Sequence, residues 1–176
     1  ALHALREALP RVQLMAMVQA SLQELLAGHP DVDEAVVEPS LQGTWWQRAW
    51  HLSRLWRSWR VSTVIISNPK KEYHVAAWLA GIPTRVGYDR KGGWLLTHRV
   101  PDQKALGDRH EVEYNLDLIR ALGLPVSVTP CQIPSFVVEE ADVLQLIEQQ
   151  GVKSSDPFLV VHPWTSSPTK QWPLDR

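Results

Sequence analysis

Hydrophobic residues along the chain alternate between short continuous runs and segments with helical spacing. Leu2, Leu5 and Leu9 recur at the spacing of one helix face, and Pro10 ends that segment. Continuous apolar runs are typical of buried parallel strands. Together the two patterns predict helices at residues 1–9, 22–26, 45–60, 72–80, 110–122 and 139–150, and strands at residues 12–18, 35–37, 61–67, 84–88, 94–98 and 158–162. Such an order predicts an α/β fold, in which helices cover a parallel sheet.

The helix predicted at residues 45–60 has two distinct faces. One face is expected to pack on the sheet and carries Trp45, Ala49, Leu52, Trp56 and Trp59. Another carries Trp46, Trp50, Arg54 and Arg57. The sequence has no acidic residue between Pro39 and Lys71, so this region is locally basic. Tryptophan and cations together indicate a membrane-contact surface. The alternative is that the tryptophans pack on a neighbouring loop and the arginines are solvated.

Two basic loops follow predicted strands, and ligands of open α/β sheets bind at the carboxyl ends of strands. The first loop contains Asn68, Lys70 and Lys71, and the second contains Arg90 and Lys91. Lysines near the start of a helix are mildly unfavourable, which favours a role in binding an anion. The alternative is a pair of solvated lysines at a helix start.

The strand predicted at residues 158–162 leads into a loop of small hydroxyl residues and one lysine. Trp172-Pro173 then marks a helix start, because proline suits the first helical turn. Backbone N–H groups at a helix start, with Thr165, Ser166 and Lys170 beside them, would suit a phosphate or diphosphate. The loop contains no glycine, so it does not match the nucleoside-triphosphate loop. An ordinary strand-to-helix connection is the alternative.

Composition excludes several classes of protein. The net charge of -1 gives no general footprint for nucleic acid, so we expect no nucleic-acid partner. One cysteine, Cys131, cannot form an intramolecular disulfide and fits a reducing compartment. Neither a transmembrane run nor a signal peptide is visible. The 176 residues suffice for one domain with a substantial core.

Several motifs, in order, resemble the family 9 glycosyltransferases, the ADP-heptose:lipopolysaccharide heptosyltransferases. The resemblance is carried by Leu5-Arg6-Glu7-Ala8-Leu9-Pro10, by residues 28–34, 66–71, 80–88, 97–98 and 110–124, and by His162-Pro163 followed by Lys170-Gln171-Trp172-Pro173. It implies the GT-B architecture, two Rossmann-like domains that face a cleft. Residues 1–152 would form the acceptor-side domain, truncated, and residues 153–176 the incomplete start of the nucleotide-sugar-binding domain.

The resemblance also implies an activity. The parent enzyme would transfer heptose, with inversion and without a metal or other cofactor, from a nucleotide-diphosphate heptose to the lipid-linked inner core of lipopolysaccharide. Thr165, Ser166 and Lys170 would bind the donor diphosphate, and Asn68, Lys70, Lys71, Arg90 and Lys91 the acceptor. The enzyme would be cytoplasmic. Independently of the resemblance, the membrane-contact surface expected from Trp46, Trp50, Arg54 and Arg57 would make it peripheral on the inner membrane.

The sequence departs from the family pattern at its start. The family begins with a strand and a Gly-Asp turn whose aspartate is the expected general base, and that position would lie upstream of Ala1. Asp89 and Glu72 are nearest to the expected cleft, but each is more simply a loop or helix-cap carboxylate, so the catalytic residue stays unknown and the fragment is expected to be inactive. Two alternatives remain: a GT-B transferase for another nucleotide sugar, and a non-catalytic carbohydrate- or lipid-surface-binding protein.

Overall fold

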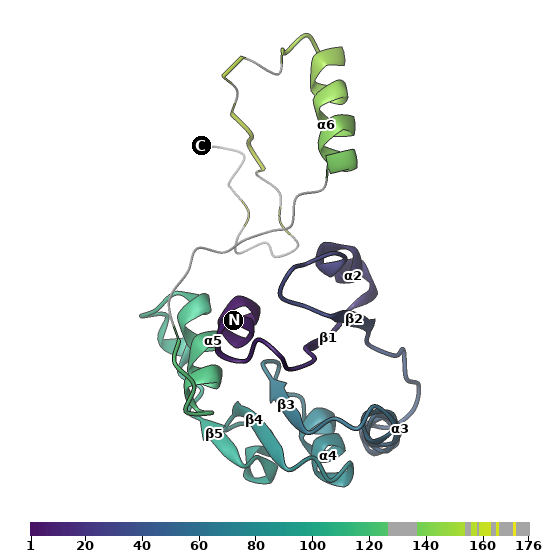
Figure 1. Ribbon diagram of the computed structural model, residues 1–176, viewed down its shortest axis with the longest axis vertical. Helices are drawn as coiled ribbons and strands as arrows, with labels where there is room; N and C mark the ends of the chain where they lie inside the picture. Colours follow the sequence, from purple (N-terminus) through teal and green to yellow (C-terminus); the bar gives the residue numbers. More distant parts are fainter. Residues whose placement is uncertain (127–136, 154–155, 158, 163–164, 166–170, 172–176) are drawn as a thin grey trace. The chain divides into compact units, whose positions relative to one another are not determined.

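The computed structural model describes the chain except for residues 127–136, 154–155, 158, 163–164, 166–170 and 172–176 (Figure 1). The chain divides into two compact units, Ala1–Pro134 and Ser135–Arg176. The domain boundary expected between residues 152 and 153 concerns a complete two-domain enzyme, and it stays a prediction.

The first unit alternates helices and short strands as the hydrophobic pattern predicts. In chain order its elements are α1 (Leu2–Ala8), β1 (Met15–Val18), α2 (Ala20–Leu26), β2 (Glu34–Val37), α3 (Trp45–Ser58), β3 (Thr63–Ile66), α4 (Lys71–Leu79), β4 (Thr84–Tyr88), η1 (Gly93–Leu95), β5 (His98–Val100), η2 (Lys104–Leu106) and α5 (Glu111–Arg120). The two η elements are single turns of 3-10 helix.

All strand pairs are parallel, as expected, but they form two ladders. One contains β1 and β2, with Met15 opposite Glu34, and the other has the order β3-β4-β5. Ile66 lies opposite Gly87, and Tyr88 lies opposite Val100. Parallel strands end at the same edge of a sheet, so the chain leaves β3, β4 and β5 along one carboxyl edge.

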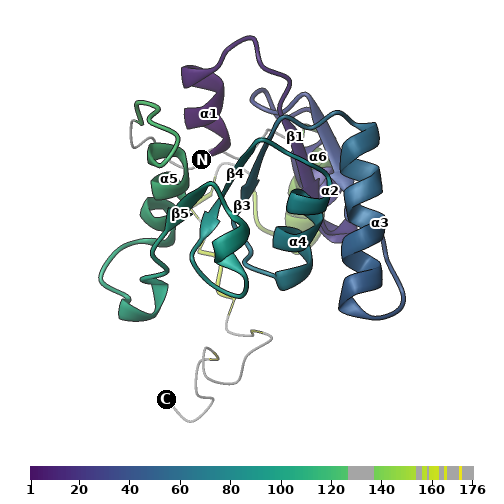
Figure 2. The ribbon, with the colours of Figure 1, turned by 90° about the horizontal axis from the view of Figure 1, so that it is seen from below.

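Helices cover both faces of the β3-β4-β5 sheet (Figure 1, Figure 2). Neighbouring strand residues point to opposite faces, so Ile66 packs on the α3–α4 side and Ile65 packs against the cluster on the α5 side. Core residues on the first side are Ala49, Leu52, Trp56, Ile66, Tyr73, Ala76, Ala77, Ile82 and Leu96. Those on the second side are Val86, Tyr88, Val100 and Leu118, with Ala4, Leu116 and Ile119 between α1 and α5.

Helices α3 and α4 lie side by side and run in the same direction. The Arg48 guanidinium lies 3.3 Å from Glu72 near the two N-termini, and the Arg57 guanidinium donates to the Leu79 carbonyl near the two C-termini. Because α4 follows the carboxyl end of β3, both helices begin at the carboxyl edge of the sheet. Thr44 begins α3 with a capping box, in which its N–H donates to Gln47 Oε1 at 2.8 Å.

The structure corrects several local predictions in the first unit. Residues 94–98 do not form a strand: Gly93–Leu95 is a 3-10 turn and the strand is His98–Val100. Trp45 is exposed at the first turn of α3, where no preceding turn of helix covers it, whereas Ala49, Leu52 and Trp56 are buried as expected. Helix α2 has no buried residue, and its Leu22 and Leu25 are exposed.

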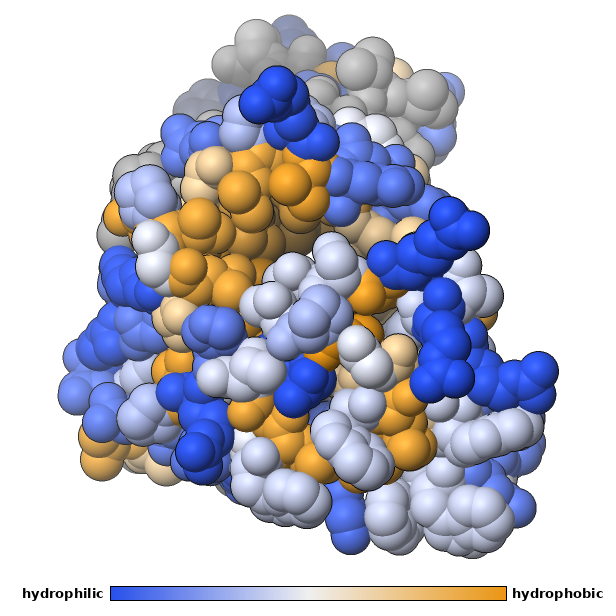
Figure 3. Space-filling model, turned by 60° about the horizontal axis from the view of Figure 1, so that its bottom comes forward, coloured by the Kyte–Doolittle hydropathy of each residue, from blue (hydrophilic) through white to orange (hydrophobic). Residues whose placement is uncertain are grey.

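On the face drawn in Figure 3, apolar side chains gather around a hollow.

The second unit contains α6 (Val137–Gln149), which Gly151 terminates in the left-handed conformation (φ 84°). The predicted strand at residues 158–162 is not formed over residues 159–162, and Phe158 lies outside the described residues. Leu159, Val160 and Val161 are largely exposed. A parallel strand is stable only beside a partner strand, and the described part of this unit has none.

No helix in the described part of the chain is both long enough and apolar enough to span a bilayer.

A buried histidine joins α4 to the loop after β4. His74 is fully buried, and its Nδ1 lies 3.3 Å from the Lys91 carbonyl, while its Nε2 has no partner among the described residues. The bond holds Lys91 in a left-handed conformation (φ 48°), which is uncommon for a residue other than glycine, and Gly92 follows it with φ 100°. Burial lowers the pKa of His74, outweighing the hydrogen bond to Lys91, so the folded protein holds the neutral imidazole.

We therefore expect His74 to make folding sensitive to acid. The folded-state pKa lies below the unfolded value of about 6.5, so the unfolded chain binds more protons as the pH falls through this range, and stability is lost there. His74→Asn keeps a donor for Lys91 without a titrating ring, so it should flatten the pH dependence of the free energy of unfolding between about pH 7.5 and pH 5. Urea unfolding at each pH measures this, with His51→Asn, on the exposed face of α3, as the matched control. An unchanged slope in His74→Asn would contradict the assignment.

Candidate functional site

The loops that leave β3, β4 and β5 surround an open pocket of about 450 Å³ at the carboxyl edge of the sheet. This is the edge at which open α/β sheets bind ligands. Its lining combines charged groups with one aromatic residue and comprises Pro69, Tyr88, Asp89, Arg90, Asp102, Lys104 and Ala105.

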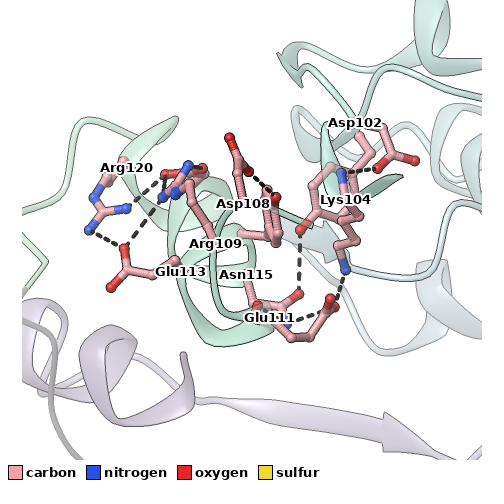
Figure 4. A network of polar contacts seen from close by, with 11 residues as sticks. Asp102, Lys104, Asp108, Arg109, Glu111, Glu113, Asn115 and Arg120 are labelled. Carbon is pink, nitrogen blue, oxygen red and sulfur yellow. Dashed lines mark hydrogen bonds and ion pairs between the residues drawn. The ribbon is translucent and has the colours of Figure 1, made fainter. Parts of the chain in front are cut away.

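Tyr88, the last residue of β4, is buried beneath one wall of the pocket. The Lys104 ammonium lies 4.6 Å from the centre of its ring and also pairs with Glu111 at the start of α5 (Figure 4). Burial raises the pKa of Tyr88, so its hydroxyl stays protonated, 3.5 Å from Asn115 Oδ1. Burial alone would lower the pKa of Lys104, but Glu111 and Tyr88 raise it overall, so the pocket keeps this positive charge at neutral pH.

An ion pair joins the loop after β4 to the loop after β5. The Arg90 guanidinium donates to Asp102 Oδ2 at 2.9 Å, and Asp102 Oδ1 accepts from the Lys104 backbone N–H at 3.3 Å. The Arg90 guanidinium holds the pKa of Asp102 below its ordinary value, so this carboxylate is ionised at neutral pH. The pair fixes one rim of the pocket while the Arg90 side chain remains more than half exposed.

The predicted acceptor residues meet at this edge, but Arg90 alone among them lines the pocket. Lys70 donates to the Tyr73 hydroxyl at 2.9 Å and lies 3.6 Å from Glu38, and the bond to Tyr73 raises the pKa of Lys70 despite partial burial. Lys71 lies over the Trp45 ring, 3.9 Å from its centre. Of the other predicted acceptor residues, Asn68 is exposed, and the backbone carbonyl of Lys91 accepts a hydrogen bond from His74.

Glu38, Tyr73 and Lys70 form a polar cluster between the end of β2 and the start of α4. The buried Tyr73 hydroxyl donates to Glu38 and accepts from Lys70. Burial and the bond to Glu38 raise the pKa of Tyr73, so the hydroxyl keeps its proton. The Lys70 ammonium therefore already lies beside the Glu38 carboxylate, and a ligand would have to compete with Glu38 for it.

Tyr88, Asp102 and Lys104 are not identified as site residues by the sequence pattern. Tyr88 ends the strand predicted at residues 84–88, so the rule about strand ends could have found it. Asp102 and Lys104 follow the true β5, His98–Val100, whereas the strand predicted at residues 94–98 ends where β5 begins.

The two acidic residues nearest to the expected cleft have different surroundings. Glu72 pairs with Arg48 between α4 and α3, which makes it a structural contact. Asp89 is exposed on the pocket wall, with Arg99 4.0 Å away. Within the described residues, no group of three or more His, Cys, Asp or Glu side chains could hold a metal ion.

The predicted diphosphate loop lies mostly outside the described residues. Ser166 and Lys170 are not described, and Thr165 is described and exposed. The binding of a diphosphate by these three residues stays a prediction.

The outer face of α5 carries a separate set of ion pairs. Arg109 lies 2.7 Å from Asp117 and 3.3 Å from Glu113, and Arg120 reaches the same two carboxylates (Figure 4). Exposed pairs of this kind contribute about 0–1 kcal/mol each. They neutralise the acidic face of the helix and do not line the pocket.

Comparison with solved structures confirms the predicted fold class. A glycosyl transferase family 9 from Veillonella parvula DSM 2008 superposes with a TM-score of 0.79 at 20% sequence identity, over 98% of this chain and 50% of its own. ADP-heptose lps heptosyltransferase II of E. coli superposes with a TM-score of 0.62 at 21% identity, over 89% of this chain and 46% of its own.

The chain thus spans about half the length of each of these proteins, and at such identities the likeness establishes the fold: parallel strands flanked by helices, as in GT-B glycosyltransferases. No family model and no curated protein sequence matches the chain.

We expect the floor and the rim of the pocket to differ in their importance for folding. Tyr88→Ala should lower the free energy of unfolding by about 3–5 kcal/mol, because it empties a buried aromatic site. Lys104→Met should cost less than about 1.5 kcal/mol, because it removes a cation–π contact and an ion pair whose partner, Glu111, is exposed. Urea denaturation measures both. Equal losses would mean that Lys104 is a structural residue.

Proposed function

We propose that this chain is the acceptor-side part of a glycosyltransferase of the family 9 type. Likeness to a family 9 glycosyl transferase over 98% of the chain carries this proposal, together with a pocket at the carboxyl edge of β3, β4 and β5. Residues 1–152 would form the acceptor-side domain, and residues 153–176 would begin the donor-binding domain.

The proposed reaction is inverting transfer of heptose from a nucleotide-diphosphate heptose to the lipopolysaccharide inner core. An acceptor hydroxyl attacks the anomeric carbon and gives its proton to a general base, while the bond from that carbon to the nucleotide diphosphate breaks and the diphosphate leaves from the opposite side. Thr165, Ser166 and the backbone of their loop would bind that diphosphate, with Lys170 neutralising the charge that develops on it. No step of this proposal uses a metal ion or another cofactor.

The acceptor would bind at the carboxyl edge of the sheet, and transfer would take place on the cytoplasmic side of the inner membrane. Arg90 and Lys104 are held on the pocket wall by Asp102 and Glu111, so charge there is largely balanced. Balanced ion pairs with exposed oxygens suit the hydroxyl groups of a saccharide. An anionic acceptor group would be bound at the rim by Asn68, Lys70, Lys71, Arg90 and Lys91.

The experiment that tests the function is an assay of the full-length protein with a panel of nucleotide-diphosphate sugars. Heptose transfer to a lipid-linked saccharide supports the proposal. Transfer of another sugar would instead support a different GT-B transferase. Saccharide binding with no turnover of any donor would support a non-catalytic binding protein.

Lys170→Ala in the full-length protein should lower kcat about 100-fold, because the leaving diphosphate loses a neutralising charge. We expect the free energy of unfolding to change by less than about 0.5 kcal/mol. Steady-state kinetics and urea denaturation measure the two effects. Lys153→Ala, an exposed lysine in the same part of the chain, is the matched control and should leave kcat unchanged. If the two variants had the same kcat, the loop would be an ordinary strand-to-helix connection with no role in binding the diphosphate.

Lys70 and its partner Glu38 allow a paired test of acceptor binding. Lys70→Met should raise KM for an anionic acceptor about tenfold, because a charged hydrogen bond is lost. Glu38→Gln should lower the same KM, since it removes the carboxylate that competes for Lys70. KM for the donor should stay the same in both variants. A change confined to the donor KM would place the donor, and not the acceptor, on this unit.

A further inference from the structure

Three tryptophans are exposed along the first half of α3. The exposed fraction is 39% for Trp45, 56% for Trp46 and 47% for Trp50. Trp46 and Trp50 are one helical turn apart, so their rings cover adjacent parts of one face. Large aromatic surfaces are costly to leave in water, and tryptophan with a polar indole N–H suits a boundary between an apolar and an aqueous phase.

Cations border these rings. The Arg54 guanidinium lies 4.8 Å from the centre of the Trp50 ring, and the Lys71 ammonium lies 3.9 Å from that of Trp45. The nearest acidic residue along α4, Glu72, is paired with Arg48. The surface therefore combines indole rings with positive charge that is not balanced by a carboxylate within it.

This surface adjoins the pocket. Helices α3 and α4 both begin at the carboxyl edge of the sheet, and the side-chain stem of Lys71 lies beside Gly92, where a Cβ would be 4.0 Å from it. Gly92 belongs to the loop whose Asp89 and Arg90 line the pocket. The tryptophan surface and the pocket rim are thus joined through Lys71 and this loop.

We propose that Trp45, Trp46, Trp50, Arg54 and Lys71 form a docking surface for anionic phospholipid. Indole rings sit at the headgroup level of a bilayer, and each basic residue near an anionic leaflet gains about 1 kcal/mol. Docking by this surface turns the carboxyl edge of the sheet towards the lipid, so that the pocket receives a saccharide whose lipid stays in the membrane. Binding of lipid is independent of the proposed transfer, and its use in presenting an acceptor rests on that function.

A second copy of this chain is the alternative occupant, and it fits the surface less well. The acidic face of α5 offers little charge to complement Arg54 and Lys71, because Arg109 and Arg120 neutralise it. Helix α6 carries exposed Glu140, Asp142 and Glu148, but helical spacing distributes these three residues around the helix, so they do not gather on one face. Anionic phospholipid supplies negative charge over the whole surface, together with an apolar phase.

Flotation of the full-length protein with vesicles tests the proposal. Vesicles of phosphatidylglycerol and phosphatidylethanolamine should carry the protein at low salt, with less bound as salt screens the cations. Trp46→Ala/Trp50→Ala should lower the vesicle partition coefficient about tenfold or more. Arg54→Gln should weaken binding to these anionic vesicles, because it removes a positive charge. Vesicles of phosphatidylcholine alone should bind the protein less strongly, and Arg54→Gln should leave that binding unchanged. The matched control is Trp78→Ala, because Trp78 is 54% exposed but lies at the C-terminal end of α4; it should leave binding unchanged.

Several results would overturn the proposal: no flotation at low salt, equal flotation of the double variant, or an equal loss in Trp78→Ala. A tryptophan-dependent dimer seen by sedimentation, without vesicle binding, would assign the surface to a second copy. Circular dichroism establishes that each variant is folded. If the double variant unfolds, Trp46→Ala alone decides, since Trp46 is the most exposed of the three rings. The lipid result is obtained without a sugar donor, so it stands or falls separately from the transferase assay.

Discussion

Parallel pairing of β3, β4 and β5 is the constraint on which the candidate site of this protein depends. Strands that run in one direction end at one edge, and each connection must cross back over a face of the sheet. The loops after the three strands are therefore neighbours, although they lie far apart along the chain. The same constraint puts the N-termini of α3 and α4 at that edge. One local support, the bond from His74 to the Lys91 carbonyl, then fixes the left-handed loop beside the pocket.

Much of this fold follows from hydrophobic periodicity. The pattern places every α-helix of the first unit to within a few residues, and it separates the buried Leu52 and Trp56 from the exposed Trp46 and Trp50. The pattern is wrong where a local contact, and not periodicity, determines the conformation or the burial of a residue. Trp45 has core spacing but lies in the first turn, where Lys71 and not the core meets its ring. Gly92 and Gly93 turn the chain tightly after β4, and an apolar stretch that resembles a strand becomes a 3-10 turn.

The candidate site was less predictable, because its chemistry lies in pairings between distant residues. Sequence identifies Lys70 as a cation at a strand end, but its partners come from elsewhere: the Tyr73 hydroxyl that it meets is bonded to Glu38, 35 positions from Tyr73 along the chain. Nothing in a single sequence indicates that Arg90 would find Asp102, or that Lys104 would lie over Tyr88. Such pairings decide whether a lysine or arginine is available to a ligand, and they follow from tertiary packing rather than from residue type.

Charge balance in the pocket bears on how an acceptor would be gathered. A wall whose cations are already bound to carboxylates attracts an anion weakly, since a ligand must compete with Asp102, Glu111 or Glu38. Confinement offers another source of binding. An acceptor anchored in a bilayer, and a protein docked on the same bilayer, meet at a raised effective concentration without any new contact. The pocket would then have to orient hydroxyl groups rather than extract an anion from solution. Under the two proposals made above, the basic surface with exposed tryptophans would supply proximity, and the charge-balanced pocket beside it would supply orientation.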